Sequence, residues 1–119
     1  MKFTVTSLLL LIIVSSCGNG SKSQTSTNDS IPACVREQIN AIEKKTVTNP
    51  PLQIDEYEYQ GKKTFLFKAD CCDQFNALYD EDCKVICAPS GGYTGRGDGK
   101  CKDFDSTAKH IKLIWKAEK

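Results

Sequence analysis

The chain has little of the chemistry on which many enzymes and nucleic-acid-binding proteins depend. Its 119 residues include one histidine, one tryptophan and one methionine. Lysine and arginine number 16 and aspartate and glutamate 15, so the charges nearly balance and no basic surface for nucleic acid is indicated. The one long apolar run, residues 3–14, is too short to span a bilayer. The length allows a single domain.

Cysteine, in contrast, is abundant, and its count of seven is odd. The first of the seven, Cys17, follows a basic start, an apolar run and two serines. This order is typical of a secretory signal peptide. Val14-Ser15-Ser16-Cys17 also resembles the bacterial lipobox, which implies that the Cys17 thiol carries a diacyl lipid and that Cys17 is the N-terminus after cleavage.

Two acyl chains anchor a protein stably, whereas one chain anchors it only reversibly. The sequence therefore predicts a signal peptide over residues 1–16, a lipidated Cys17 with a flexible Gly/Ser/Thr tether over 17–30, and one cysteine-rich domain over 31–119. Gly18 stands where lipoproteins retained at an inner membrane often have aspartate, so the resemblance favours the outer membrane. We expect an exported protein held at the bacterial cell envelope by its lipid.

Six cysteines remain for the exported domain, where an oxidising environment favours disulfides. The candidates for pairing are Cys34, Cys71, Cys72, Cys83, Cys87 and Cys101. Because a bond between adjacent cysteines strains the peptide, Cys71 and Cys72 are expected to hold two different partners, which leaves twelve connectivities open. A zinc site is the alternative, but the cysteine spacing fits it poorly.

Hydrophobic periodicity predicts an α+β fold. Ile31, Val35, Ile39 and Ile42 mark one face of a helix that runs to about Lys45, with Ser30 as its cap and Pro32 in its first turn. Residues 52–59 and 63–68 predict a β-hairpin, and residues 78–79 and 84–87 predict a second. Residues 110–116 fit either a closing strand or a short helix. We expect the N-terminal helix to pack on a small antiparallel sheet of hairpins that disulfides staple.

Residues 71–104 carry a resemblance to a known family. Their motifs are Cys71-Cys72-Asp73-Gln74-Phe75, Leu78-Tyr79-Asp80, a Gly-rich stretch from Ile86 to Cys101, and Asp103-Phe104, followed later by Leu113-Ile114-Trp115. This pattern resembles an uncharacterised family of small cysteine-rich bacterial lipoproteins, a domain of unknown function. The resemblance implies a single exported domain and no particular activity.

The Gly-rich stretch predicts a long loop over residues 88–100, between Cys87 and Cys101. Its register does not fit a phosphate-binding loop. Asp98, Asp103 and Asp105 are weak candidates for a Ca²⁺ site, although their spacing departs from the known calcium loop. Tyr93 and Arg96 are candidates for contact with a partner, because both residue types are enriched where protein interfaces gain most of their affinity.

The sequence shows no nucleophile, base and orienting group arranged for catalysis, so we expect no enzyme and no cofactor. The leading hypothesis is a membrane-anchored binding domain that presents the loop 88–100 to a protein partner in the envelope. The alternatives are a structural envelope component without a small ligand and a Ca²⁺-binding module.

Overall fold

The computed structural model describes residues 30–71 and 73–118. The predicted signal peptide, Cys17 and the tether up to residue 29 lie outside the described residues, as do Cys72 and Lys119. The elements are α1 (Ala33–Glu43), β1 (Gln53–Tyr59), β2 (Lys62–Lys68), β3 (Phe75–Tyr79), β4 (Val85–Gly91), α2 (Phe104–Thr107) and β5 (Lys109–Lys116).

The β1–β2 hairpin forms where alternating residues flank a two-residue turn. Ile54 pairs with Phe67 and Tyr59 pairs with Lys62 in an antiparallel register. Gln60 and Gly61 connect the strands, and both have positive φ, at 52° and 71°. Such a turn matches the twist of the strands it joins. This predicted hairpin is therefore confirmed.

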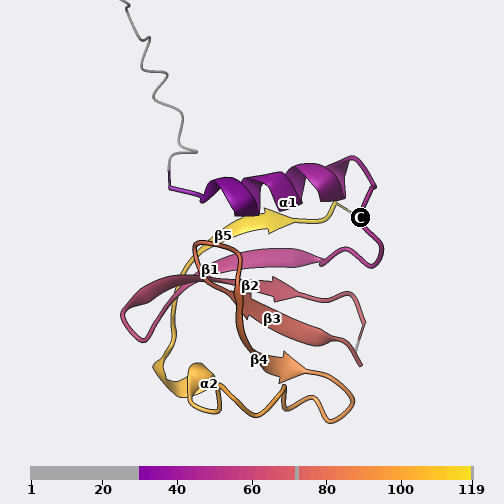
Figure 1. The fold of residues 1–119 in the computed structure, drawn as a ribbon. Helices are drawn as coiled ribbons and strands as arrows, with labels where there is room; N and C mark the ends of the chain where they lie inside the picture. The colour runs from indigo at the N-terminus through magenta and orange to yellow at the C-terminus, as the bar shows by residue number, and fades with distance from the viewer. Residues whose placement is uncertain (1–29, 72, 119) are drawn as a thin grey trace, which may run out of the picture.

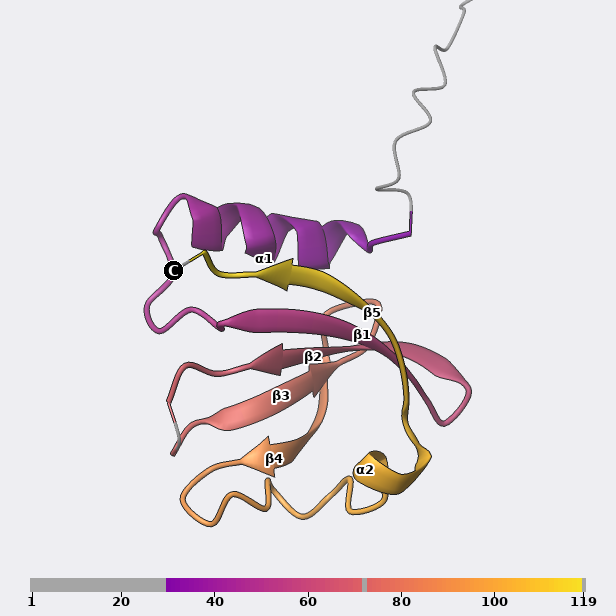
Figure 2. The ribbon, with the colours of Figure 1, turned by 180° about the vertical axis from the view of Figure 1, so that it is seen from behind.

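The described strands form one antiparallel sheet in the order β4-β3-β2-β1-β5. The second predicted hairpin is confirmed as β3 and β4, both of which are longer than the alternation indicated. Residues 109–116 form a strand, β5, which pairs with β1. The sheet thus ends in β4 on one side and β5 on the other (Figures 1 and 2).

Helix α1 lies beside β5 and β1 over one face of the sheet (Figure 1). Its buried Val35 and Ile42 share a cluster with Ile54, Phe65 and Phe67 of the sheet. Proline at the helix start is accommodated because it has no N–H that needs a partner there. The prediction of Ser30 as the cap is wrong: Pro32 is the N-cap, and the Ser30 hydroxyl accepts a hydrogen bond from Lys112 at 2.6 Å.

A second cluster of buried side chains lies on the other face of the sheet. Tyr59, Leu66 and Leu78 pack there with Phe104 of α2 and with two half-cystines. The Phe104 ring centroid is 5.0 Å from that of Tyr57 and 5.3 Å from that of Tyr59. The single-turn helix α2, which the sequence did not predict, therefore covers part of this face of β1.

Candidate functional site: the loop closed by Cys87 and Cys101

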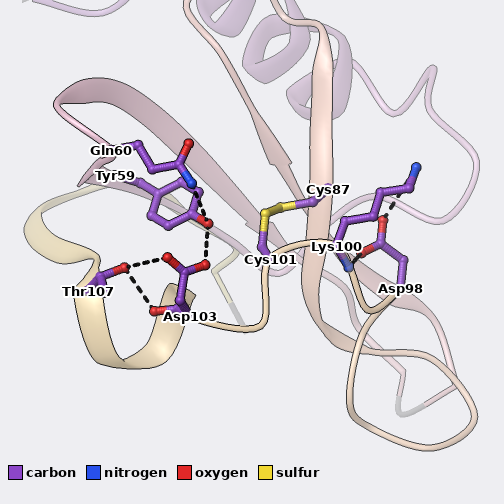
Figure 3. The surroundings of a disulfide bond; sticks show 8 residues. All are labelled: Tyr59, Gln60, Cys87, Asp98, Lys100, Cys101, Asp103 and Thr107. Atoms are coloured by element: carbon purple, nitrogen blue, oxygen red, sulfur yellow. Dashed lines mark hydrogen bonds and ion pairs between the residues drawn. A yellow bond between two sulfur atoms is a disulfide. The ribbon is translucent and has the colours of Figure 1, made fainter.

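A disulfide between Cys87 and Cys101 closes the loop that the sequence singled out (Figure 3). Both half-cystines are buried, and Cys87 lies in β4. Residues 88–91 also belong to β4, so the prediction of a loop over 88–100 is wrong at its first part. The loop itself begins at Gly92 and returns to the edge of β4.

Backbone hydrogen bonds within the loop fix its course. Asp98 N–H donates to the Ala88 carbonyl at 2.9 Å, and Gly97 N–H donates to the Gly91 carbonyl at 3.0 Å. Gly95 N–H donates to the Gly92 carbonyl at 2.9 Å, and this bond closes a turn at the tip. These amides are used internally, so they are not available to cradle an anion. The groups that the loop presents outward are its side chains.

Two of the loop glycines are required by the close approach of neighbouring backbone. Gly91 and Gly97 have positive φ, at 81° and 70°. A Cβ at Gly97 would overlap the Ala88 carbonyl oxygen, and a Cβ at Gly91 would overlap the Gln74 carbonyl oxygen. These two glycines therefore allow the loop backbone to lie directly against β4 and the start of β3.

The tip of the loop, residues 93–96, points into solvent. Tyr93 is 98% exposed and Arg96 is also exposed. Among the described residues, Arg96 has no ion-pair partner. A cavity of about 660 Å³ lies beside the tip, and charged residues of both signs, Arg96, Lys102, Asp98 and Asp105, line it.

The three carboxylates considered for Ca²⁺ do not form a common cluster. Within residues 30–71 and 73–118, no group of three or more metal-ligating side chains is present. Asp98 accepts a hydrogen bond from the Lys100 N–H at 3.0 Å, as an aspartate does in a turn (Figure 3). The structure therefore does not bring Asp98, Asp103 and Asp105 together as calcium ligands.

Asp103 is instead bonded to the core. The Tyr59 hydroxyl donates to its carboxylate at 2.7 Å, and the Thr107 hydroxyl lies 3.3 Å away (Figure 3). The bond from Tyr59, more than any other contact, holds the pKa of Asp103 below its usual value. The same bond raises the pKa of Tyr59. This pair fixes α2 to the end of β1.

Four of the six candidate cysteines form two disulfides, Cys34–Cys83 and Cys87–Cys101. The first joins α1 to the turn between β3 and β4. Because these four pair among themselves, the prediction that Cys71 and Cys72 each hold a different one of them is wrong. Cys71 is exposed, and Cys72 lies outside the described residues.

The sequence did not identify a polar cluster around Asp55. This carboxylate is only 2% exposed, and it lies 3.0 Å from Lys68 Nζ and 3.1 Å from His110 Nε2. Gln53 donates to it as well, at 2.6 Å. Burial alone would raise the pKa of Asp55, but the bonds from His110, Lys68 and Gln53 outweigh burial and lower it.

His110 thus has an orienting carboxylate, which the sequence did not reveal. Within the described part of the chain, Asp55 is the one hydrogen-bond partner of the His110 imidazole, and no serine, threonine or cysteine side chain is bonded to this ring. The placement of Asp55 on the same face as Tyr57 and Tyr59 was the available signal, because that face of β1 is covered. The pairing with His110 required the register of β5 beside β1.

No helix in the described residues is long and apolar enough to cross a membrane. The family described as a domain of unknown function, DUF6970, matches residues 40–117, which is more than half of the chain. The chain belongs to this family. Neither a curated protein nor a solved structure matches the chain.

Proposed function

We propose that the chain is a lipid-anchored protein of the bacterial cell envelope whose domain binds a protein partner through the loop tip, residues 93–96. The observation that carries the proposal is the 98% exposure of Tyr93 on a loop whose base is closed by the Cys87–Cys101 disulfide. A tyrosine side chain exposed to solvent buries no area in the domain and so does not stabilise its fold. It gains contact area when a partner covers it.

The rigidity of the loop supports binding by the tip. Association costs free energy when flexible groups become ordered, so a loop that is already fixed loses less. Here the disulfide and the bonds from Asp98 to Ala88 and from Gly97 to Gly91 fix the backbone before any partner arrives. Arg96 adds a guanidinium without an ion-pair partner among the described residues.

The proposed anchor places the domain within reach of the membrane surface. A tether of residues 17–30 has a root-mean-square reach of about 20 Å. It would enter the domain at Ser30, whose hydroxyl and carbonyl accept hydrogen bonds from Lys112 and Lys63. The support for this anchor is the likeness of residues 14–17 to the lipobox.

Site-specific photo-crosslinking in cells tests the binding proposal. A photoreactive phenylalanine analogue replaces Tyr93 in one variant and Glu37, an exposed residue of α1, in the matched control. We expect one defined adduct from position 93 and none from position 37. A third variant carries the analogue at Thr94. The adduct that it forms should disappear when Arg96→Ser is introduced into the same chain. Equal adducts from both positions, or none from position 93, would indicate a structural envelope component instead.

The anchor is tested separately by labelling cells with an alkyne-bearing palmitate. The unaltered chain should incorporate the label and sediment with membranes, and Cys17→Ala should do neither. Labelling of Cys17→Ala at the unaltered level would disprove lipidation at Cys17. It would leave the proposal for the loop tip untouched, because the adduct at position 93 does not depend on the lipid.

A further inference from the structure

The sheet has two edges, and the chain covers one of them with its own loop. Gly97 N–H donates to Gly91, Asp98 N–H donates to Ala88, and Gly91 pairs with Arg96 in a parallel bridge. These bonds occupy the outer side of β4. The loop therefore protects this edge from pairing with another strand.

At the other edge, no described segment adds backbone hydrogen bonds to the outer side of β5 in this way, although α1 lies beside this strand. β1 is the one described strand that pairs with it. Residues 109–113 are all exposed, including Ile111 at 43% and Leu113 at 50%. An edge strand presents N–H and C=O groups without sheet partners, and apolar side chains beside them add area for a partner to bury.

The charge of β5 has a single sign. The strand contains Lys109, Lys112 and Lys116, with His110, and no acidic residue. Lys112 lies 3.5 Å from Glu56, so its charge is partly compensated. Lys109 and Lys116 make no ion pair with any described residue.

The positive charge of β5 distinguishes between two kinds of occupant for this edge of the sheet. A second copy of the chain would bring lysines against lysines, and lysines on edge strands keep copies apart in this way. An acidic strand would turn the same repulsion into attraction. The register shifts between β1 and β5, after Ile54 and after Glu56, shorten the regular stretch of β5, so the occupant is a short segment.

We propose that β5 accepts a short extended segment of a partner protein, rich in acidic and aliphatic residues, as a further strand of the sheet. The segment's backbone would pair with β5. Lys109 lies opposite Glu58 and Lys116 opposite Gln53, so the two lysines lie on opposite faces of the sheet, and an acidic side chain on either face of the segment would meet one of them. Aliphatic side chains of the segment would cover Ile111 and Leu113. This site lies on the edge opposite the loop, so it is independent of the loop tip.

The only tryptophan of the chain, Trp115, lies in β5 and reports on binding there. The purified full-length chain in detergent is titrated with a short capped peptide that alternates glutamate and valine. We expect a saturable change in Trp115 fluorescence that weakens with added salt, and slower amide hydrogen exchange confined to residues 109–116. A peptide alternating lysine and valine should produce neither.

Two further comparisons separate strand pairing from simple charge attraction. Lys109→Glu with Lys116→Glu should raise Kd about 5- to 30-fold, because two exposed charge pairs become repulsive. The matched control, Lys84→Glu with Lys100→Glu, changes the net charge equally at exposed sites on the β4 side of the sheet and should leave Kd unchanged. The acidic peptide with N-methylated backbone amides should bind at least tenfold more weakly, because it cannot donate to the sheet.

Three results would overturn the proposal. The first is equal affinity for the acidic and the lysine peptide, and the second is undiminished affinity of the N-methylated peptide. The third is protection of residues 109–116 that rises with the concentration of the chain alone, which would identify a second copy as the occupant.

Discussion

Asp55 shows how one buried carboxylate is held in its charged form. Its partners Lys68 and His110 come from the strands on either side of β1, so the three side chains join three strands across the sheet. Because these bonds lower the pKa of Asp55 despite its burial, the charged form stabilises the fold. The contribution is present above the unfolded pKa and is lost as pH falls through the folded value.

We therefore expect Asp55→Asn to lower the free energy of unfolding at pH 7 by about 1–3 kcal/mol. The difference from the unaltered chain should shrink as pH falls below about 4, where the unfolded chain begins to bind the proton, and should vanish only below the lowered pKa of the folded state. Urea denaturation followed by Trp115 fluorescence at pH 7 and pH 3 measures it. Asp82→Asn, at an exposed position, is the control and should change little at either pH. A difference that grows on acidification would contradict the assignment.

The Tyr59–Asp103 bond makes a second prediction for single side chains. The Tyr59 hydroxyl, at 2.7 Å, is the main cause of the lowered pKa of Asp103. Tyr59→Phe should move the pKa of Asp103 upward toward its ordinary value, as measured by carboxyl-carbon NMR during an acid titration. Tyr93→Phe, at an exposed site with no bond to Asp103, should leave that titration unchanged. An unchanged Asp103 in Tyr59→Phe would show that Thr107 and the backbone set its pKa.

Helix α1 and the β1–β2 hairpin were predictable because their signals are local. Apolar residues at helical spacing mark α1, and alternation around Gln60-Gly61 marks the hairpin. β5 was ambiguous because its apolar residues do not alternate cleanly. The register shifts explain this: two extra residues in β5 break the period of two. The start of α1 was misplaced because Ser30 bonds to a distant strand rather than to the helix.

The features of the candidate site were likewise predictable where their signals are local and not predictable where they depend on distant residues. Cys87 and Cys101 flank the glycines, so the sequence indicated where the loop and its exposed Tyr93 would lie. The sequence did not indicate the pairing of the cysteines, or that residues 88–91 continue β4. Asp55 and His110 are separated by most of the domain in sequence, so only the register of β1 with β5 brings them together.

Gly95 and Gly97 provide a matched test of the loop. Both have positive φ, at 73° and 70°, so alanine at either site should cost about 1–2 kcal/mol of folding free energy. At Gly95 a Cβ meets open space, whereas at Gly97 it overlaps the Ala88 carbonyl oxygen. Gly97→Ala should therefore be more destabilising than Gly95→Ala by about 1–3 kcal/mol in thermal or urea unfolding. Equal losses would show that the loop moves away from β4 without cost.

Over the whole molecule, the two disulfides belong to the clusters on opposite faces of the sheet. Cys34–Cys83 joins α1 to the β3–β4 turn, and its two half-cystines pack against the cluster of Val35, Ile54 and Phe67. Cys87–Cys101 belongs to the cluster on the other face, with Tyr59, Leu78 and Phe104. A small domain buries a modest fraction of its surface, so covalent links to both clusters add stability that packing alone does not supply.

The two links should differ in how much they stabilise the fold. Cys34 and Cys83 are 49 residues apart in sequence and Cys87 and Cys101 are 14 apart, so the first restricts the unfolded chain more. Loop-closure entropy gives about 4 kcal/mol for the first and about 3 kcal/mol for the second. We expect Cys34→Ser with Cys83→Ser to unfold at lower urea than Cys87→Ser with Cys101→Ser.

Hydrogen exchange separates these global effects from local ones. Loss of Cys34–Cys83 should speed exchange throughout the sheet, because it lowers the free energy of unfolding for the whole domain. Loss of Cys87–Cys101 should speed exchange most at the Gly97 and Asp98 amides, which bond the loop to β4. It should also lower the yield of the adduct formed from position 93, since a loop without its disulfide has to become ordered when it binds. Unchanged exchange at Gly97 and Asp98 would show that the backbone bonds alone hold the loop in place.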